Sequence, residues 1–504
     1  MLNTPRSTGV LLHPTSLPNS WGIGSIGPEA VKFAEFLAEA GQSIWQILPL
    51  GPTGFGNSPY TCFSAFAGNP LLISIDWLLE DKLLDPNSVL DYPDFPEDRV
   101  KFEEVVNRKN LLLAESYQRW KQSSASGLRV SYQKFCSENE EWIDDYALFM
   151  ALRLKYDHKS WNQWPTPIAH RNKQSIEKAT LELADEIDEQ IYYQFLFDHH
   201  WRRFRKETAH TGIQIFGDIP IFVAYNSSDT WSHPDQFNLE PDGTPKVIAG
   251  VPPDYFSETG QRWGNPLYDW DQMKADDYIW WKSRFRKTFE MMDVARIDHF
   301  RGFESFWEIP AHEETAVNGQ WVEGPGMDLF LSLEKEFGKM NVVAEDLGAI
   351  TPEVEALVEA TGFPGMKVLQ FAFGDDDTNP FLPHNYPTNC VVYTGTHDND
   401  STRSWFEKAP EEHRKFCMKY TAARPGAVSW DLIRVALHSK AHLSMIPFQD
   451  YLSLGEAGRM NVPGVSDGNW SWRCFPSTMN ESLAKSMKLL AKETNRCPAS
   501  HTDE

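Results

Sequence analysis

The chain has 504 residues, of which 41% are hydrophobic and 23% charged, a composition typical of a globular protein with a large core. Its 71 acidic residues outnumber its 47 basic ones and give a net charge of −24, which argues against nucleic acid or an anionic membrane surface as a partner. No stretch approaches 18 apolar residues, the first ten residues lack a signal-like apolar core, and the six cysteines form no C-x-x-C pair. We therefore expect a cytoplasmic protein with reduced thiols.

Eight short apolar runs are predicted to be strands, and most of them end in polar residues. In chain order they are 9–12, 43–48, 213–216, 294–297, 341–344, 366–371, 390–393 and 443–447. Segments with helical periodicity lie between them, at 28–40, 189–208, 271–289, 328–337, 352–361 and 428–438, and a last one at 482–493. Strands that alternate with helices favour a parallel sheet, and eight of them favour an α/β fold of the (β/α)8 TIM-barrel type over residues 1–504.

Two regions interrupt this alternation. Residues 76–188 are rich in Glu, Lys, Leu and Trp with helical spacing, notably at 101–120 and 132–156, and are predicted to be a mainly helical insertion after the second strand. Residues 225–270 carry many Pro, Gly, Asn and aromatic residues without periodicity. A loop of that length is uncommon unless it has a function, so we expect a lid or substrate-binding region there.

Two motifs resemble ligand sites but lack the required context. Residues 22–27 match G-x-G-x-x-G, yet Pro14 and Pro18 separate them from the preceding strand, and residues 41–50 contain no acidic residue to hold a ribose. Residues 375–379 begin like a calcium loop, but the sixth position is Pro380 and the twelfth is Tyr386, so this is not an EF-hand. Neither a dinucleotide nor calcium is expected as a ligand.

Four carboxylates carry the strongest chemical signal, because each follows a different predicted strand. Asp218, Asp298, Glu345 and Asp398 follow the third, fourth, fifth and seventh strands. Neighbouring barrel strands lie ~4.8 Å apart, so acids at the ends of the fourth and fifth strands can meet across one bond. Retaining glycosidases use a pair ~5–5.5 Å apart, one as nucleophile and one as acid–base. A single such acid is usually a solvated strand end, whereas four at corresponding positions favour a catalytic cluster.

The environment of each acid suggests its role. Arg296 and Asp298 lie on one face of their strand, and the positive charge should lower the pKa of Asp298 and keep it ionised for attack. A structural ion pair that closes the strand is the alternative. Glu345 follows an apolar strand, and partial burial would raise its pKa and make it a proton donor. Asp398, beside His397, could hold sugar hydroxyls and stabilise positive charge in the transition state.

The segments around these acids resemble the 4-α-glucanotransferases known as amylomaltase or disproportionating enzyme, in the α-amylase clan. The resemblance extends over nearly the whole chain. The matching segments are Leu11-Leu-His-Pro-Thr-Ser-Leu-Pro18, Ser58-Pro-Tyr60, Gly217-Asp-Ile-Pro-Ile-Phe-Val223, Gly250-Val-Pro-Pro-Asp-Tyr-Phe256, Thr259-Gly-Gln-Arg-Trp-Gly-Asn-Pro266, Arg296-Ile-Asp-His-Phe-Arg-Gly302, Ala344-Glu-Asp-Leu-Gly348, Thr394-Gly-Thr-His-Asp-Asn-Asp400, Arg459-Met-Asn-Val-Pro-Gly464 and Asn469-Trp-Ser-Trp-Arg473. His312 and Val465 depart from the family pattern, outside the chemistry.

The resemblance implies roles that agree with those argued from the residues. It makes Asp298 the nucleophile, Glu345 the acid–base and Asp398 the transition-state carboxylate. It implies that residues 250–266 form a lid, and that substrate is bound by Tyr60, Asp218, Asp254, Gln261, Trp263, Arg296, His397 and Asn461. It also implies α-1,4-glucans such as maltodextrins, amylose and glycogen as donor and acceptor, glucose as a further acceptor, no cofactor and no metal.

Two other functions are the alternatives. An α-amylase-like hydrolase would need the same carboxylates and a site more open to water. The intact set of acids argues against the second alternative, a non-catalytic glucan-binding protein. The preferred prediction is a double-displacement transferase.

Overall fold

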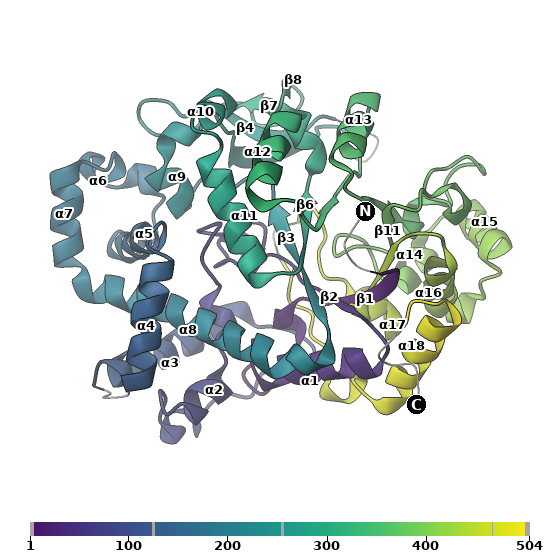
Figure 1. Ribbon diagram of the computed structural model, residues 1–504, viewed down its shortest axis with the longest axis horizontal. Helices are drawn as coiled ribbons and strands as arrows, with labels where there is room; N and C mark the ends of the chain where they lie inside the picture. Colours follow the sequence, from purple (N-terminus) through teal and green to yellow (C-terminus); the bar gives the residue numbers. More distant parts are fainter. Residues whose placement is uncertain (1–4, 123–125, 254–256, 466, 499–504) are drawn as a thin grey trace.

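The eight predicted strands are all present and form one parallel sheet that curves into a barrel (Figure 1). The computed structural model describes residues 5–122, 126–253, 257–465 and 467–498. The sheet order is β10-β11-β12-β1-β2-β3-β6-β9, and the Ala344 amide donates to the Pro364 carbonyl at 2.9 Å where β9 meets β10. This confirms the (β/α)8 barrel. Its strands are β1 (Ser7–Leu11), β2 (Ile44–Gln46), β3 (Gln214–Pro220), β6 (Val294–Asp298), β9 (Val342–Ala344), β10 (Gly365–Val368), β11 (Cys390–Tyr393) and β12 (Leu443–Pro447).

The barrel interior changes from apolar to polar along its strands. Phe216 on β3 and Val294 on β6 belong to a buried cluster with apolar residues of five other strands. Because side chains alternate, the next inward residues are Asp218 and Arg296, which are direct partners in the β3–β6 register. A closed apolar layer therefore supports a charged layer near the carboxyl ends of the strands, where barrel enzymes place their chemistry.

Helices pack around the barrel, and most match a predicted segment. The predicted helix at 271–289 is instead two helices, α10 and α11, because Asp277 and Tyr278 adopt left-handed backbone with φ of 58° and 57°. In the described residues the helices outside the insertion are α1 (Pro28–Glu39), α8 (Ala184–Thr208), α9 (Ser228–Ser232), α10 (Trp270–Ala275), α11 (Ile279–Met291), α12 (Met327–Phe337), α13 (Pro352–Thr361), α14 (Thr402–Lys408), α15 (Glu411–Thr421), α16 (Val428–His438), α17 (Phe448–Tyr451) and α18 (Glu481–Glu493).

The segment between β2 and β3 is largely helical in its described residues and lies to one side of the barrel (Figure 1). It has a hydrophobic cluster separate from that of the barrel interior, in which Phe149, Trp161 and Trp164 pack with Trp231 of α9. The predicted helix at 132–156 is interrupted, because α4 ends at Glu138 and α5 begins at Ile143. The helices are α2 (Ile75–Glu80), α3 (Phe102–Gln122), α4 (Ser126–Glu138), α5 (Ile143–Lys155), α6 (Thr166–Ala169) and α7 (Lys173–Glu182).

A four-stranded antiparallel sheet lies above the barrel in Figure 1, with the order β5-β4-β7-β8. Its strands are β4 (Val247–Val251), β5 (Gln261–Pro266), β7 (Ser305–Pro310) and β8 (Gln320–Glu323). Residues 225–270 therefore contain regular structure that the sequence did not predict. A register shift between Ile248 and Gly250 breaks the alternation of β4, and β5 is mostly polar and partly exposed, so neither strand shows a two-residue period.

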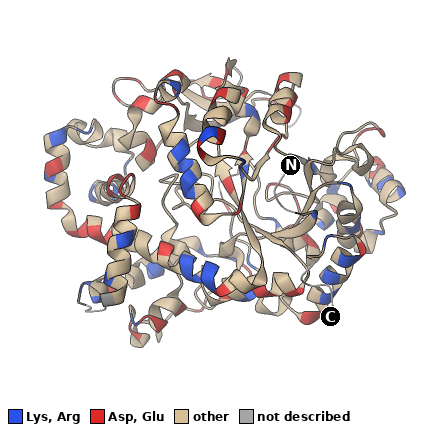
Figure 2. Ribbon diagram, viewed as in Figure 1, with Lys and Arg blue, Asp and Glu red and all other residues tan. Residues whose placement is uncertain are grey.

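Acidic and basic residues are mixed along the outer helices (Figure 2). On α8, for example, Arg202 pairs with Asp198 and Arg203 with Glu207. Such exposed pairs contribute little to stability. Within the residues that the structure describes, no helix combines the length and the apolarity needed to cross a membrane.

Candidate active site

The charged layer at the top of the barrel is organised by one guanidinium. Arg296 donates through Nε to Asp218 Oδ1 at 3.0 Å and through Nη2 to Asp218 Oδ2 at 2.7 Å. The same Nη2 donates to Asp298 Oδ1 at 2.7 Å. The side chain of Asp218 is 0% exposed, whereas that of Asp298 is 32% exposed. Arg296 therefore joins a buried carboxylate, that of Asp218, to the partly exposed carboxylate of Asp298, which a ligand can reach.

Tyr60, from the loop after β2, links this layer to the segment after β11. Its hydroxyl donates to Asp218 Oδ2 at 2.6 Å and accepts from Arg296 Nη2 at 3.2 Å. Its ring stacks on that of His397 with centroids 5.1 Å apart. The ring centroid of Trp470 lies 5.9 Å from the centroid of each of these two rings. Burial lowers the pKa of His397, so this stacked ring is neutral at neutral pH. The arrangement supplies an aromatic wall with no positive charge of its own.

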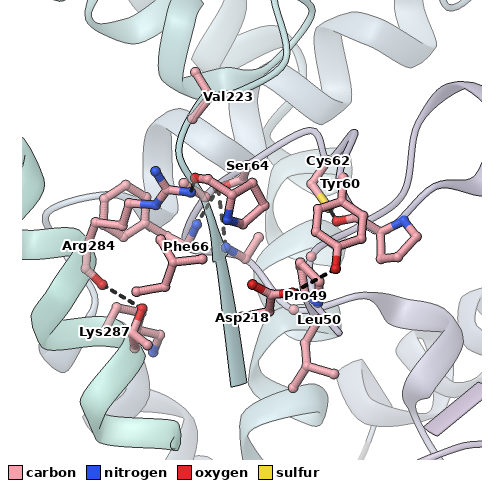
Figure 3. A pocket seen from close by; sticks show the side chains of 18 of the residues that line it. Pro49, Leu50, Tyr60, Cys62, Ser64, Phe66, Asp218, Val223, Arg284 and Lys287 are labelled. Carbon is pink, nitrogen blue, oxygen red and sulfur yellow. Dashed lines mark hydrogen bonds between the residues drawn. The ribbon is translucent and has the colours of Figure 1, made fainter. Parts of the chain in front are cut away.

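Figure 3 shows the Tyr60 hydroxyl directed toward Asp218, and both residues line a cavity beside β3. The cavity lies between the loop that contains Cys62 and Phe66 and helix α11, which supplies Arg284 and Lys287. Arg284 is buried and donates to the Pro220 carbonyl at 2.5 Å, at the carboxyl end of β3. Helix α11 thus anchors the end of the strand that carries Asp218.

Glu345 follows β9 and lies beside the end of β6. Its Oε2 accepts from the His299 amide at 2.7 Å, and its Oε1 accepts from the Leu347 amide at 2.8 Å. His299 has a left-handed backbone, with φ of 51°, and directly follows Asp298. The fold therefore brings Asp298 and Glu345 together, as predicted from their positions after neighbouring strands.

Burial raises the pKa values of both acids. It raises the pKa of Glu345 to about 7, against the opposing effects of Arg296 and of the two backbone amides. It also raises the pKa of Asp298, and Arg296 is the main opposing influence there. The prediction of a lowered pKa for Asp298 was wrong because it considered the arginine and not the burial. The pair therefore retains a proton at a pH where isolated carboxyls are ionised.

Asp398 is the third acid of the site and the most accessible, with its side chain 47% exposed. Its Oδ1 accepts from Asn461 Nδ2 at 2.6 Å and lies 3.4 Å from His397 Nε2. Arg459 donates to the Asp398 backbone carbonyl at 3.1 Å. The segment around residue 461 thus orients the carboxylate that the loop after β11 presents.

Two of the predicted substrate contacts lie on β5, above the barrel. The Trp263 indole N–H donates to Gln261 Oε1 at 3.1 Å, and the Trp263 ring packs edge-on against His299 with centroids 4.8 Å apart. Because His299 follows Asp298, this contact places β5 at the edge of the acid pair. Asp254, also a predicted contact, lies outside the described residues.

Sequence reasoning did not assign two residues that the structure places in the site. His299 supplies the amide that binds Glu345, and its position next to Asp298 was the available signal. Trp470 closes the aromatic wall, and it lies in a segment already noted for its resemblance, 469–473.

Comparison with known proteins gives one consistent result. A family model described as 4-alpha-glucanotransferase matches residues 12–477. The 4-alpha-glucanotransferase of Thermus thermophilus is 46% identical over 503 residues, which cover 98% of this chain and 100% of the relative. That of Synechocystis sp. is 45% identical over 502 residues, 99% of each. The solved structure of amylomaltase from Streptococcus agalactiae in complex with acarbose superposes with a TM-score of 0.95 at 35% identity, covering 98% of this chain and 100% of that one. The chain therefore belongs to the 4-alpha-glucanotransferase family, as its motifs indicated.

Proposed function

We propose that the protein is a 4-α-glucanotransferase that moves a segment of one α-1,4-glucan to the 4-hydroxyl of another glucan or of glucose. One observation carries this proposal. The Glu345 carboxyl accepts a hydrogen bond from the amide of His299, the residue after Asp298, and Arg296 donates to Asp298 itself. Two adjacent carboxyls in unequal environments are the requirement of a retaining double displacement.

The first half-reaction breaks the donor linkage. One Asp298 oxygen attacks the anomeric carbon and forms a glycosyl ester, while Glu345 gives its proton to the glycosidic oxygen and the leaving glucan departs with that proton. We assign the negative charge of the pair to Asp298, which Arg296 contacts directly, and the proton to Glu345. Burial of Glu345 keeps that proton available near neutral pH.

The second half-reaction forms the new linkage. The 4-hydroxyl of the acceptor attacks the anomeric carbon of the ester, Glu345 takes the hydroxyl proton, and Asp298 leaves as a carboxylate. Two inversions restore the α configuration. The pair is then ready for another donor.

Asp398 and Asp218 have different proposed roles. Asp398 is accessible, so we assign it to bind sugar hydroxyls and to stabilise positive charge in the transition state, with His397 beside it. Asp218 has no exposed side-chain surface and both of its oxygens bind Arg296, so it orients the arginine and does not itself hold sugar. This assignment revises its expected role as a substrate contact.

Transfer requires that water be excluded while the acceptor is held. We assign this task to Tyr60 and Trp470 on one side and to Gln261 and Trp263 of β5 on the other. Trp263 supports the assignment because the residue is 38% exposed while its ring forms a T-shaped contact with His299. Aromatic faces of this kind can stack on the apolar faces of sugar rings.

Pure maltotriose provides the test. The proposal predicts glucose plus longer maltodextrins with no net rise in reducing ends, and no products from Asp298→Asn. A rise in reducing ends would show a hydrolase. Unchanged maltotriose, with binding retained in wild type and variant alike, would show a glucan-binding protein without activity.

We further propose a cytoplasmic location. The described thiols of Cys62, Cys136, Cys390, Cys417 and Cys474 are free, which is typical of a reducing compartment.

A further inference from the structure

A buried carboxylate, Asp450, lies behind the loop that carries Asp398. Asp450 belongs to α17, which directly follows β12, and only 1% of its surface is exposed. Its Oδ2 accepts from the hydroxyls of Thr394 and Thr402, at 2.5 and 2.6 Å, and its Oδ1 accepts from the Thr402 amide at 2.7 Å. This carboxylate is outside the reaction described above.

The two threonines mark the two ends of one catalytic loop. Thr394 follows β11, and Thr402 is the first residue of α14. Residues 395–401 between them carry His397 and Asp398. Because both hydroxyls donate to the same oxygen of Asp450, that oxygen joins the two ends of the loop.

The opposite side of the loop has separate supports. Asn461 binds the Asp398 carboxylate and Arg459 binds its backbone carbonyl. These contacts orient the exposed end of the loop, while Asp450 determines where the loop begins and ends. Asp398 is thus supported by Asn461 and Arg459 at the exposed end of its loop, and its loop is supported by Asp450 in the protein interior.

We propose that Asp450 is a positioning residue that sets the place of Asp398 in the transition state by binding both ends of its loop. The inference rests on the proposed role of Asp398. Burying a carboxylate is costly unless its hydrogen bonds are satisfied, and three donors satisfy this one. Catalytic groups must be held to within ~0.5 Å of their working geometry, which such short charge-assisted bonds can achieve.

Thr394→Val tests the proposal, because valine keeps the shape of threonine and removes one of the two hydroxyl bonds to Asp450 Oδ2. We expect kcat for maltotriose disproportionation to fall about tenfold or more, with KM changed less than about twofold. The reason is that a small displacement of a catalytic group lowers the reaction rate strongly. Thr394→Ser, which keeps a hydroxyl, should recover most of kcat. Asp450→Asn should lower kcat in the same way.

Thr208→Val is the matched control. Thr208 is also buried, and its hydroxyl donates to the Phe204 carbonyl at 2.8 Å at the end of α8, before β3 begins. The Thr208→Val variant should lower Tm by about as much as Thr394→Val does, and it should leave kcat unchanged. If the two variants have equal kcat at equal Tm, the positioning role is wrong. Should Asp450→Asn fail to fold, the comparison of Thr394→Val with Thr208→Val decides alone.

Asp398→Asn separates this inference from the proposed function. Full activity in that variant would overturn the role of Asp398 and the inference with it. Loss of activity there, combined with wild-type kcat in Thr394→Val and Asp450→Asn, would overturn the positioning role only.

Discussion

Asp218 and Arg296 are direct partners on neighbouring strands and form a two-pronged ion pair inside the barrel, with side chains 0% and 4% exposed. The pair holds the guanidinium plane by Nε and Nη2, and the same Nη2 reaches Asp298. The orientation of the proposed nucleophile therefore depends on a carboxylate one strand away.

Asp218→Ala should be strongly destabilising, because it leaves the buried charge of Arg296 without the carboxylate that binds both Nε and Nη2. Breaking one side of a buried pair costs about 3–5 kcal/mol in the free energy of unfolding, measured here by urea denaturation. Glu407→Ala is the control, since the exposed Arg403–Glu407 pair on α14, with side chains 55% and 56% exposed, should contribute about 0.5 kcal/mol or less. Similar losses in both variants would contradict the organising role of the Asp218–Arg296 pair.

The pH dependence of kcat/KM should report the proton on Glu345. Because the first half-reaction needs that proton, kcat/KM for maltotriose should decline as the pH rises through the Glu345 pKa of about 7. Glu345→Gln should abolish use of maltotriose but retain attack on α-glucosyl fluoride, whose fluoride leaves without a proton. A flat profile from pH 6 to pH 9, or equal loss with both donors, would contradict the acid role.

Glu345 should also make the protein less stable as the pH rises. Its folded pKa of about 7 lies above the ordinary value of 4.5, so the folded state binds the proton more tightly. The stabilisation is complete below pH 4.5 and is lost as the pH approaches the folded pKa. Relative to wild type, Glu345→Gln should therefore gain free energy of unfolding across this range, by at most about 1.4 kcal/mol per pH unit.

Glu353→Gln is the control of opposite sign. Backbone hydrogen bonding in the first turn of α13 lowers the pKa of Glu353. Replacing this ionised carboxylate with the neutral amide of glutamine should therefore reduce the free energy of unfolding at pH 8. Urea denaturation of both variants at pH 5 and pH 8 gives the comparison. A Glu345→Gln variant that is no more stable than wild type at pH 8 would contradict the raised pKa.

The barrel could be predicted from the sequence because its strands are apolar runs that end in polar residues. Even the three-residue strand β9 could be located, since Val342–Ala344 is apolar and Glu345 follows it. Helices α13 and α16 begin and end where their periodicity does. The small sheet could not be predicted, because β5 is polar and pairs with β4 across a register shift.

The acids of the site could be predicted individually, but their environments could not. Both oxygens of Asp218 accept hydrogen bonds from Arg296, 78 positions later, and the sequence does not reveal this pairing. The pKa of Asp298 depends on its burial in the folded protein. Alternation along a strand predicts which residues share a face, whereas solvent access follows only from the assembled barrel.

Asn461→Asp should make kcat depend on pH, because it replaces a hydrogen-bond donor to Asp398 with a second carboxylate. Asn461 Nδ2 donates to Asp398 Oδ1 at 2.6 Å, so aspartate there would place two carboxylates in contact. Like charges at this distance raise a pKa of the pair, and a proton held between them weakens the charge that Asp398 offers the substrate. Asn461→Ala removes the same hydrogen bond without adding a titrating group. Relative to wild type, the alanine variant should lose kcat by the same factor at every pH, whereas the factor for the aspartate variant should change by about tenfold between pH 5 and pH 8. Parallel profiles for the two variants would contradict a direct contact between the side chain at position 461 and the Asp398 carboxylate.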